Sequence, residues 1–287
     1  MGDREAASLF SSHPRSFREN RYVYPVLSRR AGGISLGINL NPGKDCNFHC
    51  IYCQVDRREM PPRTFVEVDR LVRELEAGME LVVSGKLFDD AKFAAVPPDL
   101  RALHDIAFSG DGEPTTFRNF DEVVERCTEI KQQLAPPDVK TVVITNASML
   151  DRPAVVRAMA CLDRSNGEIW AKLDAGTEAY YRRVARASIP FDRILANITM
   201  TAKARPIVIQ TLFMKIDDVP PSEQEIAAYI ERLREITAAG GRIRLVQIYT
   251  VARAPAESYV APLEADQLDA IVDRVRSVTD LPVVGYV

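Results

Sequence analysis

Three of the five cysteines in this 287-residue chain lie within one short run, CNFHCIYC, at Cys46, Cys50 and Cys53. Thiolates are soft ligands that select zinc, copper(I) or iron–sulfur clusters in proteins. A C-x-x-C element in a chain with so few cysteines indicates a metal site more readily than a disulfide. The run therefore predicts a metal centre held by three sulfur ligands.

The other two cysteines, Cys127 and Cys161, fall in segments whose apolar residues repeat with helical spacing. We expect both to be small buried core residues, since unreactive cysteine behaves as a hydrophobe. Three protein ligands leave one coordination position open, which is typical of catalytic metal sites. The C-x3-C-x2-C spacing also differs from the C-x2-C-x2-C run of electron-carrying ferredoxins. Zinc with His49 as the fourth ligand is the alternative, disfavoured because His49 directly adjoins Cys50.

Apolar runs of strand length alternate with longer amphipathic segments along the chain. Six repeats of strand then helix predict an α/β fold, a partial (β/α)6 barrel of parallel strands with outer helices. The expected strands are Ile34–Leu40, Asp105–Ser109, Thr141–Thr145, Glu168–Leu173, Ile207–Phe213, Arg244–Tyr249 and a terminal Val283–Val287. The expected helices are Val66–Met79, Phe120–Leu134, Pro153–Leu162, Glu178–Ala187, Phe191–Thr201, Ser222–Ala239 and Ala265–Thr279.

The cysteine run follows the first of these strands, where parallel α/β barrels place their chemistry. It resembles the C-x3-C-x-(aromatic)-C signature of radical S-adenosylmethionine (SAM) enzymes. The resemblance implies one 4Fe–4S cluster on Cys46, Cys50 and Cys53, whose free iron chelates SAM, with Tyr52 as the aromatic residue near adenine. It also implies an iron–sulfur oxidoreductase that cleaves SAM to a 5′-deoxyadenosyl radical, and an electron donor such as flavodoxin or ferredoxin.

A second motif, SGDGEP, follows the next expected strand and contains Gly110, Asp111, Gly112 and Glu113. Its glycines allow close approach of the backbone to a ligand, and Glu113 can accept a hydrogen bond from a cationic amine. The motif resembles the glycine-glycine-glutamate element that holds the SAM amino group in the same family, although Asp111 replaces the usual glycine. A tight turn before the Phe120 helix is the alternative interpretation.

Polar residues also follow the later strands. In radical SAM enzymes the corresponding strand ends contact the SAM ribose and carboxylate, which implies cofactor-binding roles for Asn146, Lys172 and Asp174. Gln210 and Tyr249 are further candidates for the same layer. Arg29, Arg30 and Lys44 flank the first expected strand and its loop, and we expect them to face an anionic group of the substrate.

The chain from about residue 22 to 250, most densely from Arg29 to Arg57, resembles the radical SAM subgroup related to the archaeal tRNA wyosine-base synthase. Those enzymes carry a second cluster on cysteines upstream of the radical motif, and no cysteine precedes Cys46 here. The resemblance therefore implies radical SAM chemistry, but we expect a reaction other than wyosine-base formation. The substrate stays open between a small molecule, a peptide and tRNA.

The net charge of −3 and a pI near 5.8 predict no general attraction to nucleic acid. We expect a single domain over residues 1–287, with an N-terminal extension (1–30), a barrel core (31–250) and a C-terminal extension (251–287). No apolar run is long enough for a membrane span and residues 1–10 lack a signal-peptide core, which predicts a cytoplasmic protein without membrane contact. A metal-stabilised binding protein, or an RNA-binding module with a structural cluster, remains the non-catalytic alternative. The arginines available to an RNA partner are Arg15, Arg18, Arg21, Arg29, Arg30, Arg57, Arg58 and Arg63.

Overall fold

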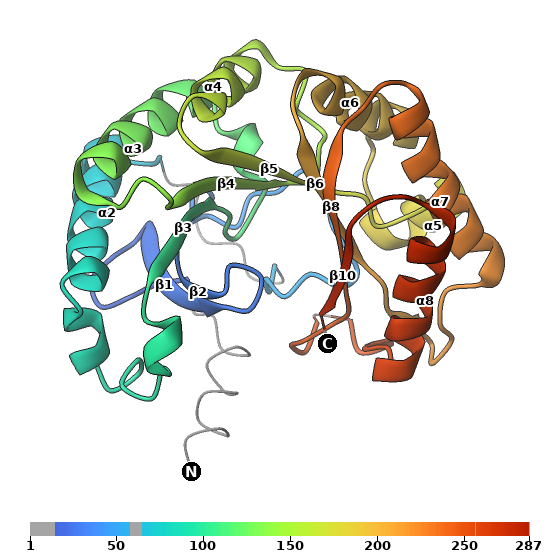
Figure 1. Ribbon diagram of the computed structural model, residues 1–287, viewed down its shortest axis with the longest axis horizontal. Helices are drawn as coiled ribbons and strands as arrows, with labels where there is room; N and C mark the ends of the chain where they lie inside the picture. Colours follow the sequence, from blue (N-terminus) through green and yellow to red (C-terminus); the bar gives the residue numbers. More distant parts are fainter. Residues whose placement is uncertain (1–14, 58–64, 256, 287) are drawn as a thin grey trace. The chain divides into compact units, whose positions relative to one another are not determined.

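The structure, a computed structural model, describes residues 15–57, 65–255 and 257–286 (Figure 1). Its contacts divide the chain into two compact units. Of the described residues, the first unit comprises 15–46, 65–144 and 152–168, and the second comprises 47–57, 145–151, 169–255 and 257–286. We describe each unit by itself.

The first unit is built on four strands in the order β1-β2-β3-β4. Strand β1 is antiparallel to β2, whereas β2, β3 and β4 run parallel. Helices cover this sheet, and each one follows a parallel strand in the sequence (Figure 1). The strands are β1 (Val23–Ser28), β2 (Gly33–Ile38), β3 (Leu103–Phe108) and β4 (Lys140–Thr145). The helices are α2 (Val68–Val83), α3 (Phe120–Leu134) and α4 (Pro153–Asp163), with short 3-10 turns η1 (Lys86–Asp89), η2 (Pro98–Leu100) and η3 (Pro114–Thr116).

Helix α3 shows why these segments fold as they do. Its apolar residues recur at steps of three and four, and Phe120, Val123, Val124 and Cys127 are all buried. Cys127 is 1% exposed, which confirms its prediction as a buried core residue, whereas Cys161, predicted to be buried as well, has intermediate exposure. Burial raises the pKa of the Cys127 thiol to about 12, so it stays protonated and unreactive.

The second unit contains four parallel strands in the order β5-β6-β8-β10. A separate two-stranded antiparallel ribbon is formed by β7 and β9. The strands are β5 (Gly167–Lys172), β6 (Ile207–Leu212), β7 (Lys215–Ile216), β8 (Ile243–Tyr249), β9 (Val260–Ala261) and β10 (Val283–Tyr286). The helices are α5 (Glu178–Ala185), α6 (Phe191–Ala204), α7 (Glu223–Ala238) and α8 (Ala265–Val278).

The predicted α/β class, with parallel strands alternating with helices as in a partial (β/α)6 barrel, is confirmed. Helix α3 has the predicted bounds, and the other predicted helices and strands differ at their ends by a few residues. Val287 of the predicted terminal strand lies outside the described residues. The single-domain arrangement and its extensions stay predictions, and residues 1–14 of the N-terminal extension also lie outside the described part.

Strand β1 was not predicted and lies within the segment assigned to the N-terminal extension. Its residues are buried without the alternation that marks a half-exposed strand, and Pro25 interrupts the run. Proline is tolerated in strands at a sheet edge, and β1 is the first strand in the order of its unit. Strand β1 forms a hairpin with β2, and Arg29 and Arg30 lie in the turn between them.

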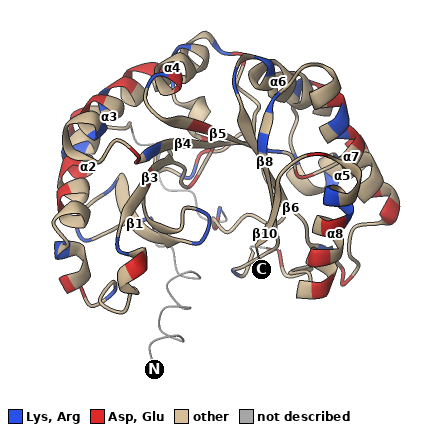
Figure 2. Cartoon of the chain, in the orientation of Figure 1, with Lys and Arg blue, Asp and Glu red and all other residues tan. Residues whose placement is uncertain are grey.

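Acidic and basic residues both occur along the outer helices, including α2 and α3 (Figure 2). This mixture agrees with the small net charge of −3. Among the described residues, no helix combines the length and apolar character that a membrane crossing requires.

Candidate functional site

The predicted cluster ligands lie in an irregular loop that crosses the boundary of the two units between Cys46 and Asn47. All three cysteines are free thiols with intermediate exposure. Within the second unit, the backbone N–H of Cys53 donates to the carbonyl of Cys50 at 3.0 Å, which forms a tight turn between these two sulfurs. No set of three His, Cys, Asp or Glu side chains forms a preassembled metal site within the described residues.

The end of helix α5 holds the cysteine loop in the second unit. The backbone N–H of His49 donates to the carbonyl of Ala185 at 3.1 Å, and that of Ile51 donates to the carbonyl of Val184 at 2.9 Å. These carbonyls lie in the last turn of α5, where no intrahelical donor is available. The loop therefore uses groups that the helix itself leaves unpaired.

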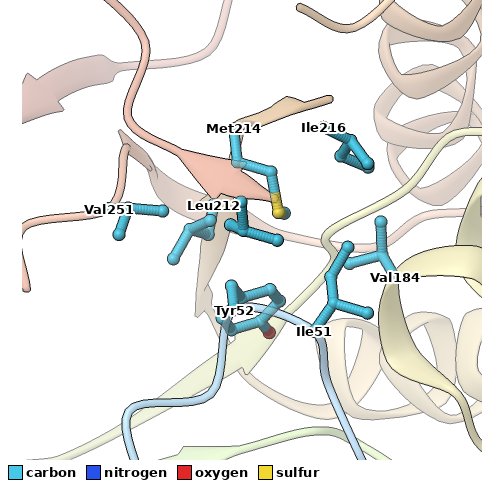
Figure 3. Close-up of a cluster of buried hydrophobic side chains, with 8 residues drawn as sticks. Ile51, Tyr52, Val184, Leu212, Met214, Ile216 and Val251 are labelled. Atoms are coloured by element: carbon cyan, nitrogen blue, oxygen red, sulfur yellow. The ribbon is translucent and has the colours of Figure 1, made fainter. Parts of the chain in front are cut away.

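An apolar cluster packs around the same loop (Figure 3). Ile51 is 1% exposed, and Cys50 lies against the cluster as a partly buried neighbour. The loop is thus anchored by both backbone hydrogen bonds and burial of apolar surface. The members of this cluster are Ile51, Tyr52, Val184, Leu212, Met214, Ile216, Val251 and Val260.

Four of the predicted cofactor-binding side chains lie together in the second unit. The Lys172 ammonium lies 2.8 Å from the hydroxyl of Tyr249 and 3.3 Å from the nearer Asp174 carboxylate oxygen. The Tyr52 hydroxyl donates to the same carboxylate, and the backbone N–H of Leu212 donates to its other oxygen at 2.8 Å. The ammonium also lies 5.0 Å and 5.3 Å from the ring centroids of Tyr52 and Tyr249, within cation–π range.

The electrostatics of this group fix its protonation. Burial alone would lower the pKa of Lys172, but the Asp174 carboxylate and Tyr249 outweigh it and raise the pKa above its usual value. Burial and the nearby Asp174 raise the pKa of Tyr52. Burial likewise raises the pKa of the Cys50 thiol to about 12. At neutral pH the Lys172 ammonium, the Tyr52 phenol and the Cys50 thiol therefore all keep their protons.

The segment after Asp174 is held by a residue that the sequence analysis missed. The Glu225 carboxylate accepts from the backbone N–H of Gly176 at 2.5 Å and of Thr177 at 3.3 Å, and from the Thr177 hydroxyl. A Cβ on Gly176 would lie 2.1 Å from the backbone nitrogen of Tyr229, so only glycine fits. The N-cap residue of α7 is Ser222, and the backbone N–H of Glu225 donates to its hydroxyl at 3.2 Å, so Glu225 also belongs to the first turn of α7.

Gln210 lies in register with Lys172 on one side and Gln247 on the other. Residues in register on parallel strands face the same side of the sheet, so these three form a polar row. The Gln210 amide donates to the Gln247 carbonyl oxygen at 2.8 Å, while its own side-chain oxygen is buried without a partner in the described structure. Gln247 was not predicted.

Asn146 is tied to the cysteine loop within the second unit. Its amide donates to the side-chain oxygen of Asn47 at 2.9 Å, and its oxygen accepts from the backbone N–H and hydroxyl of Ser148 at 3.1 Å and 2.6 Å. The Asn47 amide also donates to the Ser148 hydroxyl at 2.8 Å. These bonds orient the Asn146 side chain and connect it with the residue that follows Cys46.

The glycine-rich motif lies in the first unit and is organised by Asn39, which the sequence analysis also missed. The Asn39 side-chain oxygen accepts from the backbone N–H of Asn41 at 3.0 Å and of Asp111 at 3.2 Å, while its amide donates to the Asp111 carboxylate at 2.6 Å. Arg15 lies 3.3 Å from that carboxylate. Asp111, which replaces the usual glycine of the motif, therefore adds a carboxylate that binds neighbouring groups of the protein.

Close chain approach explains the glycines of this motif. A Cβ on Gly110 would lie 2.4 Å from the side-chain oxygen of Asn39, and one on Gly112 would lie 1.8 Å from the carbonyl of Asp45. Glu113 is 4% exposed, and one of its oxygens accepts from the backbone N–H of Thr115 at 3.2 Å. Glu113 thus caps the short η3 turn, and its predicted SAM contact stays a prediction.

Arg29 and Arg30 form the turn that joins β1 to β2, so they directly precede β2, whereas the cysteine loop follows its other end. Their expected contact with an anionic group of the substrate stays a prediction. Lys44 does lie in the loop after β2, two residues before Cys46. Arg58 and Arg63 of the basic set lie outside the described residues.

A family model described as the radical SAM superfamily matches residues 40–230. The chain is 26% identical over 253 residues to the UPF0026 protein of Methanocaldococcus jannaschii, covering 86% of this chain and 68% of that protein. It is 27% identical over 216 residues to a UPF0026 protein of Helicobacter pylori, and this match covers 73% of this chain and 61% of that protein. It is also 25% identical over 234 residues to a Brachyspira hyodysenteriae protein named GTPase Obg. This match covers 80% of the present chain but only 30% of that protein's length.

Solved structures share the fold at low sequence identity. Streptococcus suis SuiB bound to S-adenosylmethionine superposes with a TM-score of 0.59 at 14% identity, covering 90% of this chain and 52% of that chain. The structure of TYW1 with a lysine–pyruvate adduct superposes with a TM-score of 0.54 at 15% identity, covering 87% of this chain and 74% of that chain. A spore photoproduct lyase mutant with a dinucleoside spore photoproduct superposes with a TM-score of 0.53 at 11% identity, covering 84% of this chain and 74% of that chain.

Proposed function

Because this chain belongs to the radical SAM superfamily, we propose that Cys46, Cys50 and Cys53 hold one 4Fe–4S cluster with which it cleaves SAM reductively. A bound cluster would supply one electron to break the sulfonium–C5′ bond of SAM, which would yield methionine and a 5′-deoxyadenosyl radical able to abstract a hydrogen atom from a substrate. The observation that carries the proposal is the C-x3-C-x2-C set of free thiols within the matched family region.

The donor chemistry of the loop fits such a cluster. Three thiols are available without disulfides, and three ligands leave one iron open for SAM. The tight turn between Cys50 and Cys53 is bonded to α5 and packed on apolar side chains, so these sulfurs are presented from a well-supported loop.

Two charged groups of the chain suit the polar ends of SAM. We assign the Lys172 ammonium, held by Asp174 and Tyr249, to an anionic carboxylate, and Glu113 to the SAM amine. Tyr52 provides an aromatic face beside Lys172, and the Asn146 amide is oriented by Asn47 and Ser148. These residues bind and orient the cofactor, while the apolar cluster around Ile51 excludes water from one side of the cysteine loop.

The substrate belongs to one of three classes, a small molecule, a peptide or tRNA, and the electron comes from a donor such as flavodoxin or ferredoxin. The net charge of −3 gives no long-range attraction to RNA, so a tRNA substrate would need a local basic surface. We place the activity in the cytoplasm, where a reducing environment preserves free thiols.

Formation of the wyosine base is the alternative within the same superfamily, and we propose that the chain does not catalyse it by the archaeal route. Residues 1–45 contain no cysteine for a second cluster. Formation of the tricyclic base from N1-methylguanosine tRNA, pyruvate, SAM and reductant would refute this exclusion.

The test is anaerobic reconstitution with iron and sulfide, followed by measurement of bound iron and of 5′-deoxyadenosine after addition of SAM and dithionite. We expect about four irons per chain, as in a single cubane cluster, and formation of 5′-deoxyadenosine. Cys50→Ala should lose both, whereas Cys127→Ala, a buried core cysteine, should keep both. Stoichiometric zinc without iron would instead favour the non-catalytic binding protein, and iron without SAM cleavage would favour a structural cluster.

A further inference from the structure

Arg57 contacts the sulfur of Cys53 directly. One guanidinium nitrogen lies 2.7 Å from Sγ, in a geometry that makes it a hydrogen-bond donor to the sulfur. The two residues belong to the same unit and are separated by four positions. In this structure Sγ is a free thiol, and it is the atom that would ligate iron in the proposed cluster.

The loop that presents Cys53 is anchored, so the contact has a defined sulfur to act on. The Cys53 N–H bonds back to Cys50, and Ile51 is bonded to α5 and buried in the apolar cluster (Figure 3). Arg57 itself is only partly buried, as is Cys53. A guanidinium has N–H donors and no acceptor, so it can face the sulfur only as a donor.

An N–H donor on a ligating sulfur has a known direction of effect. Hydrogen bonds to the sulfurs, together with net charge, set the reduction potentials of iron–sulfur clusters. Adding an electron makes a cluster more negative, so a nearby cation and an N–H···S bond both favour the reduced form. Each therefore raises the potential, and their removal lowers it.

Arginine suits this role better than lysine. Its planar guanidinium has five N–H donors, so one can contact the sulfur while the remaining donors bind other groups. Lysine would keep the charge but lose this fixed fork. A neutral side chain of similar length, such as methionine, would remove both effects.

We infer that Arg57 donates a hydrogen bond to the Cys53 ligand of the cluster and raises the cluster's one-electron reduction potential. Arg57 is then a positioning and tuning residue that acts through a ligand and does not touch SAM or substrate. This inference rests on the proposed cluster, but not on SAM cleavage or on the nature of the substrate.

The test is a potentiometric titration of the reconstituted protein without SAM, followed by electron paramagnetic resonance of the reduced cluster. A low-potential chemical reductant with mediators supplies the electron that converts the oxidised [4Fe–4S]²⁺ form to [4Fe–4S]⁺. We expect Arg57→Met to retain iron and to titrate at a more negative potential, with Arg57→Lys between it and the wild type. A tenfold change in the reduction equilibrium corresponds to about 59 mV for one electron.

Arg183→Gln is the matched control. It removes the same charge from α5, the helix that holds the cysteine loop, but Arg183 pairs with Asp217 on the surface. This variant should titrate at the wild-type potential. A shift equal to that of Arg57→Met would overturn the inference, because the effect would then be one of general charge.

An unchanged potential in iron-loaded Arg57→Met would also overturn the inference. If that variant holds no iron, the comparison passes to Arg57→Lys, in which a lower potential supports the inference and an unchanged one refutes it. Failure of the proposed function is a separate result, namely a wild-type protein that holds no iron, or one that holds four irons without cleaving SAM. The second result leaves the Arg57 titration fully interpretable.

Discussion

The backbone N–H of Ile51 donates to the carbonyl of Val184 at 2.9 Å, and the two side chains pack in the same apolar cluster. A residue between two predicted iron ligands is thereby joined to the last turn of α5. The spacing of the cysteines identifies the predicted sulfur ligands, whereas this hydrogen bond and the side-chain packing support the backbone of the loop that carries them. The loop consequently depends on a helix more than 130 residues further along the chain.

Ile51→Ala tests that dependence. Ile51 is 1% exposed, so truncation leaves a cavity, and we expect the free energy of unfolding to fall by about 3 kcal/mol. Urea unfolding monitored by circular dichroism measures the change. Val219→Ala, at a side chain that is 64% exposed, should change it by less than about 0.5 kcal/mol. Equal effects of the two substitutions would contradict the anchoring role of Ile51.

Local pattern predicted much of the fold and of the site. The helical stripe of α3 gave its bounds, and the spacing of Cys46, Cys50 and Cys53 singled out the candidate metal ligands. Strand β1 was missed because Pro25 interrupts its apolar run and no alternation of apolar and polar residues marks it.

The supporting residues could not be predicted, because their partners are distant in sequence. Asn39 binds Asp111 across 72 positions, and Glu225 binds Gly176 across 49. Both are buried polar side chains. Their neighbours in the sequence indicate only the end of a strand for Asn39 and the start of a helix for Glu225. Only the folded chain shows which buried polar groups satisfy one another.

Glu113→Gln separates the proposed SAM contact of this carboxylate from its capping role. Glutamine keeps an oxygen that can accept from Thr115, so the η3 cap should persist. It loses the charge, and the loss of a charge-assisted hydrogen bond of roughly 1.5–3 kcal/mol should weaken SAM binding about ten- to a hundredfold. Isothermal titration of the iron-loaded protein with SAM measures the affinity. Glu129→Gln, an exposed position on α3, is the control, and unchanged SAM affinity in Glu113→Gln would refute the assignment.

Lys172→Met removes the cation from a largely buried carboxylate. Asp174 would keep its bonds from Tyr52 and Leu212 but lose its ion pair, and we expect a loss of stability of about 3 kcal/mol at pH 7. Lys215→Met breaks an ion pair with the exposed Glu264 and should cost less than about 1 kcal/mol. Urea unfolding of both variants measures the difference. A smaller loss at Lys172 than at Lys215 would contradict the tight coupling of the buried group.

The pH dependence of the Lys172 effect follows from its raised pKa. A group whose pKa is higher in the folded state contributes stability that is complete below the unfolded value, near 10.4 for lysine, and is lost as the pH rises through the folded value. The stability difference between the wild type and Lys172→Met should therefore be constant from pH 6 to 9. A steady decline of that difference over this range would show that Lys172 loses its proton near neutral pH.

Asp105→Asn should stabilise the protein at neutral pH. Burial raises the pKa of Asp105 to about 6, against the lowering influence of the Ser35 hydrogen bond, Arg30 and His104, while Glu168 raises it further. Because the folded pKa exceeds the unfolded value near 3.9, the folded state holds this proton more tightly. The contribution of Asp105 to the free energy of unfolding is therefore greatest below pH 4, falls as the pH rises from about 4 to 6, and is constant above that range. Asparagine avoids the buried charge and can still accept a hydrogen bond from Ser35.

We expect Asp105→Asn to raise the free energy of unfolding by about 1–3 kcal/mol at pH 7.5, the upper value being two pKa units at about 1.4 kcal/mol each, and by only about a third of that at pH 4.5. Urea unfolding at the two pH values measures this contrast. Asp69→Asn, at a carboxylate whose side chain is 78% exposed, serves as the control and should change stability by less than about 0.5 kcal/mol at either pH. Equal stabilisation of Asp105→Asn at both pH values would mean that the substitution acts through packing and not through the buried charge.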